Sequence, residues 1–386
     1  MNEKLTHEER GIVSAIVWIS FVQMATNVIS SVLPNISAAF PSVSIAVIQL
    51  LMTFPGLFII LFTVLANVLL RFFDKKRLIE MGLLLVCLSA VISYLGYRSL
   101  FVLFIGAGVL GCGVGLCSAF AISLISDHFS GEKKQRIIGW QTAASNMGSL
   151  LMTLLGGLLA MIGWNYNFLV YLIALVAVWF CHRYVPKGGK VQENVGVHDR
   201  KCHFTRRLSM LIIVFMVLFY IAPTSISLLL SQQGKESTVA SSIGMSSFLL
   251  GGTLMSMMFF YVNRKLHRYC IVIGIALLGI GLFLMGHVQQ VLFDLACFVS
   301  GASIGLVMPR CMLEISQNEP AERVTVATSI AMAASNFGIL IAPLFTVICS
   351  DLLQIEQVSD RIETGAGICW MLAVICFMMI RRKKYG

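Results

Sequence analysis

The chain of 386 residues is 58% hydrophobic and only 12% charged, and it carries a formal net charge of +10 at pH 7. A soluble protein has roughly a quarter charged residues, so this composition excludes a water-soluble globular protein. An open strand would leave its backbone groups unpaired in lipid, and barrel strands would alternate apolar and polar residues. The long apolar runs therefore predict an all-α polytopic membrane protein.

Twelve apolar segments follow one another along the chain, and each is long enough to cross a bilayer as a helix of roughly 20 residues. The first follows a charged N-terminal segment and is too long for a signal-peptide core, so we expect it to be retained. The predicted spans are 11–33, 43–70, 78–97, 100–126, 137–163, 166–182, 208–231, 239–262, 270–287, 291–313, 324–349 and 365–380.

The basic residues predict how these spans are oriented. With the N-terminus inside, 24 of the 28 Lys and Arg residues fall in the segments on the inner side, and Arg310 falls within a span. This asymmetry is a strong positive-inside signal, so we expect both termini in the cytoplasm and the chain in the plasma membrane. The net positive charge then follows from topology and contact with anionic lipid, and it gives no reason to expect a nucleic-acid partner.

A sequence repeat relates the two halves of the chain. Residues 143–148, Ala-Ala-Ser-Asn-Met-Gly, return 190 residues later as 333–338, Ala-Ala-Ser-Asn-Phe-Gly. A repeat at about half the length of such an apolar chain predicts twelve transmembrane helices in two pseudo-symmetric six-helix bundles. The expected parts are an N-terminal half (1–184), a flexible cytoplasmic linker (185–207) and a C-terminal half (208–386).

The stretch 66–76, between spans two and three, resembles a motif of the major facilitator superfamily, G-x-x-x-D-R-x-x-G-[RK]-[RK]. The basic residues match, but Leu70 stands at the acidic position, and Ala66 and Asp74 replace the glycines. The resemblance to this family of twelve-helix secondary transporters covers nearly the whole chain. In the family this loop latches the halves together on the cytoplasmic side, so Arg71 either serves a latch or is topogenic charge alone.

Span four carries part of a second family motif, R-x-x-x-G-x-G. Its glycines are present at 111–115, but Ala107 occupies the arginine position, which excludes proton coupling through that arginine. The span ends near Asp127, which resembles the acidic end of the family's span four. This carboxylate either pairs with Arg71 or the basic loop 133–136, or is solvated at the interface.

Span five resembles the family's antiporter-type motif, G-x-x-x-G-P-x-x-G-G, which is associated with exporters. Met152 and Thr153 replace its second glycine and its proline. The glycines thin the helix and allow it to bend, which serves rocking motion without substrate contact. The gating and coupling candidates of the whole chain are Arg71, Asp127, Gly148, Gly156, Gly157, Glu314, Gly338 and Pro343.

Polar residues in the middle of the spans are candidates for substrate contact, because a polar group in hydrocarbon is costly and faces the bundle or water. For each of them, a structural hydrogen bond between helices is the competing interpretation. Two pairs lie at i, i+4 on one helix face, one on span one and one on span seven. The substrate-cavity candidates are Gln23, Asn27, Gln141, Asn146, Tyr220, Thr224, Arg310 and Asn336.

Arg310 follows Pro309 and precedes Glu314 by one turn. It is either an anion anchor or switchable ion pair, or a snorkelling residue paired with Glu314 near the cytoplasmic end, which is the interpretation we favour. A buried acid is the common proton carrier, and no carboxylate lies in the middle of spans one to six. Proton coupling would therefore use Asp294, Glu314, Asp127 or a less usual route.

These features predict a secondary active transporter that works by alternating access and exports small amphipathic compounds. The alternative is an importer or facilitator of a polar metabolite or organic anion. Protons are a candidate coupling ion, the lipid bilayer is the solvent, and we expect a monomer. The seven histidines lie in loops or at helix ends and no C-x-x-C pair occurs, so we expect no enzyme, no metal site and no cofactor.

Overall fold

The computed structural model describes residues 6–43, 45–186, 203–232, 238–287, 291–352 and 357–382. Within these ranges the chain is helical and contains no strand, and twelve helices are long and apolar enough to cross a membrane. The predicted all-α fold with twelve spans is therefore confirmed. Most of the predicted linker falls outside the described residues.

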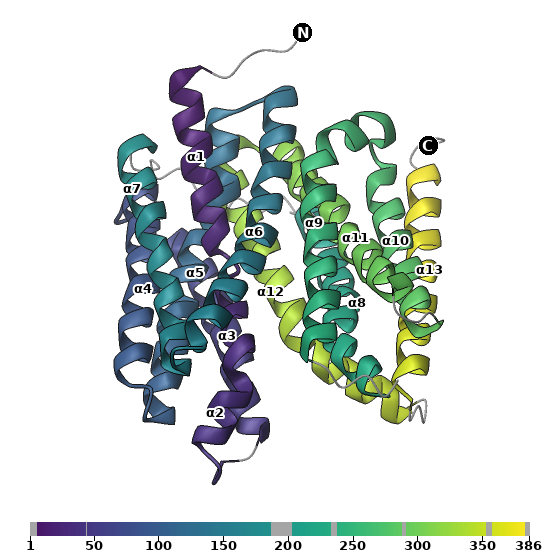
Figure 1. Cartoon of the computed structure of the whole chain (residues 1–386). Coiled ribbons are helices and arrows are strands. Elements are labelled where there is room, and N and C mark those ends of the chain that lie inside the picture. Colours follow the sequence, from purple (N-terminus) through teal and green to yellow (C-terminus); the bar gives the residue numbers. More distant parts are fainter. Residues whose placement is uncertain are drawn as a thin grey trace. The chain divides into compact units, whose positions relative to one another are not determined.

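The helices follow in an order that can be traced by colour in Figure 1. They are α1 (His7–Val22), η1 (Ala25–Val32), α2 (Leu33–Ala39), α3 (Ile45–Leu69), α4 (Lys75–Leu95), α5 (Leu100–His128), α6 (Gly131–Ala160), η2 (Trp164–Ile173), α7 (Ala174–Tyr184), α8 (His203–Gln232), α9 (Thr238–Leu266), α10 (Tyr269–His287), α11 (Val291–Asn318), α12 (Ala321–Leu352) and α13 (Val358–Arg382).

Span one is not the single α-helix that its apolar run predicts. It changes at Gln23 from α1 into the 3₁₀ helix η1 and continues as α2. The sequence of η1, Ala-Thr-Asn-Val-Ile-Ser-Ser-Val, is rich in β-branched and short polar residues, which are weak α-helix formers. Pro34 lies in the first turn of α2, where proline is favoured. Span six likewise begins with a 3₁₀ segment, η2.

Contacts group the chain into two compact units, and their boundary does not follow the linker. Helices α6 and α12 each begin in one unit and end in the other. Helix α6 passes from one unit to the other after Asn146, and α12 does so after Asn336. These two asparagines are equivalent residues of the repeat. Unit 1 comprises Met1–Ser130, Met147–Thr205 and Ser316–Asn336; unit 2 comprises Gly131–Asn146, Arg206–Ile315 and Phe337–Gly386.

Glycines repeated in the two halves allow close helix packing inside each unit. In unit 1, α5 packs against α3 and α4, and a Cβ on Gly115 would lie 2.8 Å from the carbonyl oxygen of Ile59 on α3. In unit 2, a Cβ on Gly305 of α11 would lie 2.6 Å from the backbone nitrogen of Ser256 on α9. The repeat therefore preserves a packing contact.

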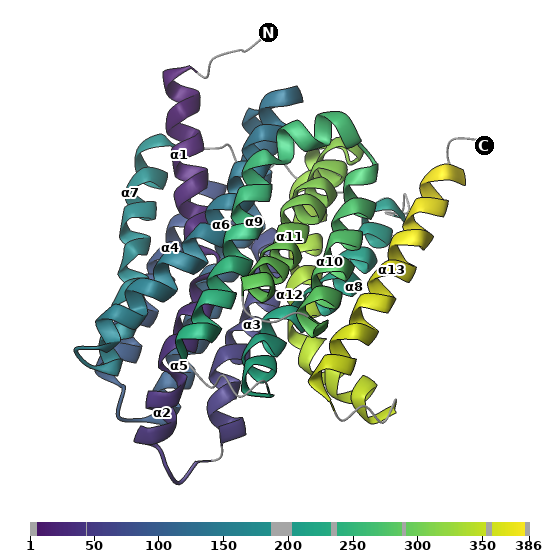
Figure 2. The same ribbon diagram turned by 45° about the vertical axis from the view of Figure 1, so that its right-hand side comes forward.

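The remaining packing in unit 2 includes a contact between α10 and α13, which run side by side in Figures 1 and 2. In unit 1, α1 packs against α7. The large buried side chains in both units are aromatic or aliphatic, and they include Phe120, Phe168, Phe215 and Phe259. These packed helices form the scaffold on which the polar networks described below are built.

Candidate functional site

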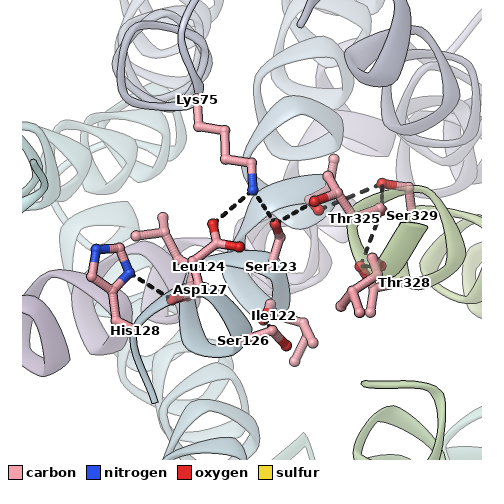
Figure 3. A network of polar contacts seen from close by, with 12 residues as sticks. Lys75, Ile122, Ser123, Leu124, Ser126, Asp127, His128, Thr325, Thr328 and Ser329 are labelled. Atoms are coloured by element: carbon pink, nitrogen blue, oxygen red, sulfur yellow. Dashed lines mark hydrogen bonds and ion pairs between the residues drawn. The ribbon is translucent and has the colours of Figure 1, made fainter. Parts of the chain in front are cut away.

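The basic end is the end of each unit that carries the Lys- and Arg-rich segments 71–77, 133–136 and 264–268, which include residues in the first turns of α4 and α6 and in the last turn of α9. A polar network lies at this end of unit 1 (Figure 3). Lys75 Nζ lies 2.7 Å from Asp127 Oδ2 and 2.7 Å from Ser123 Oγ. Ser123 Oγ lies 2.6 Å from Thr325 Oγ1 on α12, and both hydroxyl residues are buried. The network therefore connects α4 and α5 of the first sequence half with α12 of the second.

Ser329 extends this contact by one helical turn of α12. Its hydroxyl donates to the carbonyl oxygen of Thr325 at 2.8 Å. The same hydroxyl lies 3.4 Å from Asn67 Oδ1 on α3 and 3.5 Å from the carbonyl oxygen of Ala119 on α5, which is longer than an ordinary hydrogen bond. Thr328, beside it in Figure 3, donates to carbonyl groups of its own helix.

A second polar network lies at the basic end of unit 2, and its centre is Arg310. The guanidinium donates to Glu314 Oε1 from Nε at 3.1 Å and from Nη2 at 2.7 Å. Nη1 donates to Asn263 Oδ1 on α9 at 3.1 Å, and Asn263 Nδ2 donates to Gln135 Oε1 on α6 at 2.9 Å. Arg310 is 8% exposed and Asn263 is 1% exposed. The expected Arg310–Glu314 pair is thus present, and whether it is structural or switchable stays a prediction.

The first part of α6 is held against α9 by two further contacts. The guanidinium carbon of Arg136 lies 4.9 Å from the ring centroid of Phe260, within the range of a cation–π interaction. A Cβ on Gly139 would lie 2.6 Å from the carbonyl oxygen of Ser256. Helix α6 therefore begins among helices of the second sequence half, as α12 begins among helices of the first.

Gln135 and Thr325 are separated by the 190-residue repeat offset. They make the cross-half hydrogen bonds of α6 and α12, yet neither stood out in the sequence, because single polar residues near helix ends are common. The repeat offset was the available signal, since it pairs a polar residue with a polar residue at equivalent positions. Asn263 carried no such signal, because its repeat mate is Phe73.

The predicted gating residues are distributed over both units. The ion-pair partner that the structure gives Asp127 is Lys75, whereas Arg71 is exposed. Glu314 belongs to the Arg310 network. The side chain of Pro343, in α12, falls outside the part of the chain that the structure describes.

The predicted gating glycines of α6 and α12 lie against neighbouring backbone. A Cβ on Gly148 would overlap the carbonyl oxygen of Phe21 on α1, and one on Gly338 would lie 2.8 Å from the carbonyl oxygen of Ile213 on α8. Gly156 is buried and Gly157 is partly exposed. The two repeat mates, on spans five and eleven, thus pack against spans one and seven, which are themselves mates.

The predicted cavity residues fall into two groups. Gln23, Asn27 and Asn336 belong to unit 1, and Gln141, Asn146, Tyr220, Thr224 and Arg310 belong to unit 2.

In unit 1, Asn27 Nδ2 donates to Ser149 Oγ on α6 at 2.8 Å, and Asn336 Nδ2 donates to its own helix at Met332. Gln23 is buried. The Asn27 contact is an interhelical hydrogen bond of the kind that the structural interpretation predicts.

In unit 2, Thr224 is exposed and donates to the carbonyl oxygen of Tyr220 at 2.8 Å. Gln141 is buried. Asn146 is 7% exposed, and its Nδ2 has no hydrogen-bond partner among the described residues. A buried amide without a partner is costly, so this donor is the strongest of the predicted cavity groups for contact with a bound molecule.

Solved structures of transporters share this arrangement of helices. The human organic anion transporter MFSD10 (TETRAN) matches with a TM-score of 0.77 and 12% identity, covering 96% of this chain and 99% of that chain. The proton:xylose symporter XylE bound to 6-bromo-6-deoxy-D-glucose matches with a TM-score of 0.75 and 17% identity, covering 96% and 95%. FucP in the outward conformation matches with a TM-score of 0.73 and 12% identity, covering 94% and 97%.

At these identities the structural matches establish the fold. The sequence itself matches the model of the Major Facilitator Superfamily over residues 16–380, which is nearly the entire chain. The fold, the repeat and this match agree, and the chain belongs to the Major Facilitator Superfamily.

Proposed function

We propose that the chain is a secondary active transporter that exports small amphipathic compounds by alternating access, as a monomer in the plasma membrane. The observation that carries the proposal is the pair of polar networks at the basic end, which attach the first part of α12 to α5 and the first part of α6 to α9. Both attachments join residues of opposite sequence halves, so both must break for the halves to separate at this end.

The strength of these attachments suits a gate that opens and closes reversibly. A hydrogen bond contributes about 0.5–1.5 kcal/mol net, and one to a charged group about 1.5–3 kcal/mol. A bound molecule that favours one conformation by a few kcal/mol is enough to shift such an equilibrium. The Ser123–Thr325 and Asn263–Gln135 hydrogen bonds are therefore strong enough to hold the basic end closed and weak enough to be released.

The chemistry of the candidate cavity residues supports an amphipathic substrate. Apart from Arg310, all of them are uncharged amides or hydroxyls. The guanidinium of Arg310 already donates to Glu314 and Asn263, so an anionic substrate would have to displace Glu314. This engagement supports an amphipathic substrate over an organic anion anchored by Arg310.

We extend the proposal to proton coupling through Glu314. Its side chain is 18% exposed, compared with 38% for Asp127, the acid of the unit 1 network. Protonation would remove the negative charge that holds Arg310 and would loosen the contact of Arg310 with Asn263 and, through it, with Gln135. The described ionisable groups that interact with Glu314 include Arg310 and Cys311 on its own helix and Cys270 on α10.

Direction and substrate class can be tested by flux measurements. Cells that overexpress the chain are expected to accumulate less of a fluorescent amphipathic dye than cells with empty vector. Proteoliposomes would then be tested with the dye, an organic anion and xylose. Efflux of the dye supports the proposal; uptake of the anion that is lost in Arg310→Met/Glu314→Leu, with the dye unmoved, contradicts it in favour of the alternative.

The coupling step has its own test in the same proteoliposomes. An imposed pH gradient is expected to drive dye accumulation in the wild type but not in Glu314→Gln, which should still equilibrate dye down its own gradient. Asp127→Asn is the matched control, because it neutralises the acid of the other network. Gradient-driven accumulation that survives in Glu314→Gln would contradict the role of Glu314.

A further inference from the structure

We propose that η1, the 3₁₀ segment Ala25–Val32, is a switch that converts between a 3₁₀ and an α form and thereby moves α2, the last segment of span one, along the span. The proposal deepens the proposed transport cycle and rests on it for its purpose. It concerns unit 1 alone, since the segments involved are η1, α2, α4, α6 from Met147 onward, and η2.

The length of η1 is the first observation. Runs of 3₁₀ helix beyond three or four residues are uncommon, and a 3₁₀ stretch within a helix often marks a hinge. Here eight residues are 3₁₀ between two α-helical segments. The repeat mate of η1, residues 215–222, lies in α8, which is a continuous α-helix even though it contains Pro223. Neither the repeat nor a nearby proline by itself requires the break.

Two polar side chains from different helices hold η1 in its 3₁₀ form. Asn27, within η1, donates from Nδ2 to Ser149 Oγ on α6 at 2.8 Å. Asn167 of η2, which is fully buried, donates from Nδ2 to the carbonyl oxygen of Val28 at 3.4 Å. The second bond is long for an N–H···O hydrogen bond, so it is the weaker of these two contacts.

The neighbour of η1 is fixed, and free space adjoins the segment. Segment η2 packs extensively on α4, with the ring centroids of Tyr94 on α4 and Tyr166 on η2 5.5 Å apart. A cavity of about 10 Å³, near the size of a single water probe, adjoins η1 at two of its residues. Its lining includes Thr26 and Ile29 of η1 and Phe168 and Tyr171 of η2. Thr26 and Ile29 can therefore shift slightly into this space while η2 stays in place.

The geometry of the two helix types sets the size of the movement. A 3₁₀ helix rises about 2.0 Å and an α-helix about 1.5 Å per residue, so conversion of eight residues shortens the segment by about 4 Å. Pro34 in the first turn of α2 lacks the N–H that a continuous α-helix needs there, which opposes conversion of the last residues of η1. The expected displacement of α2 is about 2–4 Å.

Distances between two spin labels test this switch in the full chain in lipid nanodiscs. The labels are placed on α2 at Asn35 and at the end of α4 at Leu95, both exposed, with the native cysteines replaced. We expect two populations of the protein whose label-to-label distances differ by about 2–4 Å. Ser149→Ala and Asn167→Ala, which each remove one hold on η1, should raise the minor population about threefold relative to the major one.

The matched control is Asn165→Ala, which removes an amide from η2 at a position with no described bond to η1. A single narrow distance in the wild type and in both variants would overturn the switch. Hydrogen–deuterium exchange provides a label-free measurement: residues 25–32 should exchange faster than 215–222, and Ser149→Ala should widen the difference. Equal exchange in the two segments would also overturn the switch. Two distances between the spin labels, together with no flux of any tested compound, would overturn the proposed function and leave the switch intact.

Discussion

Gln135 and Thr325 occupy equivalent positions of the repeat, and each hydrogen-bonds a residue of the opposite sequence half. Gln135 accepts from Asn263, which also accepts from the buried guanidinium of Arg310. Thr325 shares a hydrogen bond with Ser123, which also accepts from Lys75. Arg310, the charged group linked to Gln135 through Asn263, is more deeply buried than Lys75, the charged group linked to Thr325 through Ser123. The two attachments at the basic end therefore differ in their electrostatic surroundings.

Thr325→Val is expected to loosen the attachment of α12, because valine keeps the shape of threonine and loses its hydroxyl. The expected effect is about 0.5–1.5 kcal/mol. The measurement is alkylation of a cysteine introduced at Leu124, which is 2% exposed, on a cysteine-free background. Labelling should rise about threefold. Thr328→Val is the control, since Thr328 bonds only carbonyl groups of its own helix among the described residues, and an equal rise there would contradict the prediction.

Arg310→Met is expected to lower the thermal stability strongly, because it leaves Glu314 partly buried without its described ion-pair partner. Removing one member of a buried ion pair costs about 3–5 kcal/mol. The double variant Arg310→Met/Glu314→Leu removes both charges and should be more stable than the single variant. Thermal unfolding in detergent measures both. A double variant less stable than Arg310→Met would show that the loss of stability in Arg310→Met does not come from leaving Glu314 without its partner.

Gly148→Ala is expected to destabilise the chain, because the added Cβ would overlap the carbonyl oxygen of Phe21. Gly338→Ala should do so less, since its nearest backbone oxygen is 2.8 Å away. Gly56→Ala is the control, because a Cβ there meets no described atom within 4 Å. The melting temperature should be lowest for Gly148→Ala, higher for Gly338→Ala and highest for Gly56→Ala. A Gly148→Ala protein as stable as Gly56→Ala would refute the packing argument.

Asp127→Asn is expected to have a small effect on stability. The Lys75–Asp127 ion pair is partly exposed, with side chains 19% and 38% accessible, and such pairs contribute about 0–1 kcal/mol. Salt screens exposed charges, so the difference from wild type should shrink between 0.05 and 1 M NaCl in thermal unfolding. A large, salt-independent loss would indicate a buried role for Asp127 that the described geometry does not contain.

The repeat and the apolar runs predict much of this structure because both are carried by many residues. The glycines at 111–115 and 301–305 return as matching packing contacts, and the apolar runs return as twelve long helices. The Arg310–Glu314 pair was predictable from its i, i+4 spacing. These signals are local in sequence or repeated at a fixed offset.

Features that depend on contacts between distant segments could not be predicted in this way. The partner of Asp127 is Lys75, one of several basic residues in the same loop, and only the path of α4 selects it. The 3₁₀ form of η1 depends on Ser149 and Asn167, which lie more than 120 residues away. Thr26 and Asn27 are weak α-helix formers, but the length of an apolar run predicts a span without distinguishing an α-helix from a 3₁₀ helix.

The change of unit at Asn146 has a consequence for how the chain matures during synthesis. The first 16 residues of α6, Gly131–Asn146, find their partners in Arg206–Ile315, which leaves the ribosome later. Gly139 and Arg136 can make their contacts with Ser256 and Phe260 only after those later residues have been synthesised. Domains, in contrast, generally fold in the order of their synthesis. Two fragments divided at the linker should therefore each be sensitive to proteolysis when made alone and become resistant when made together.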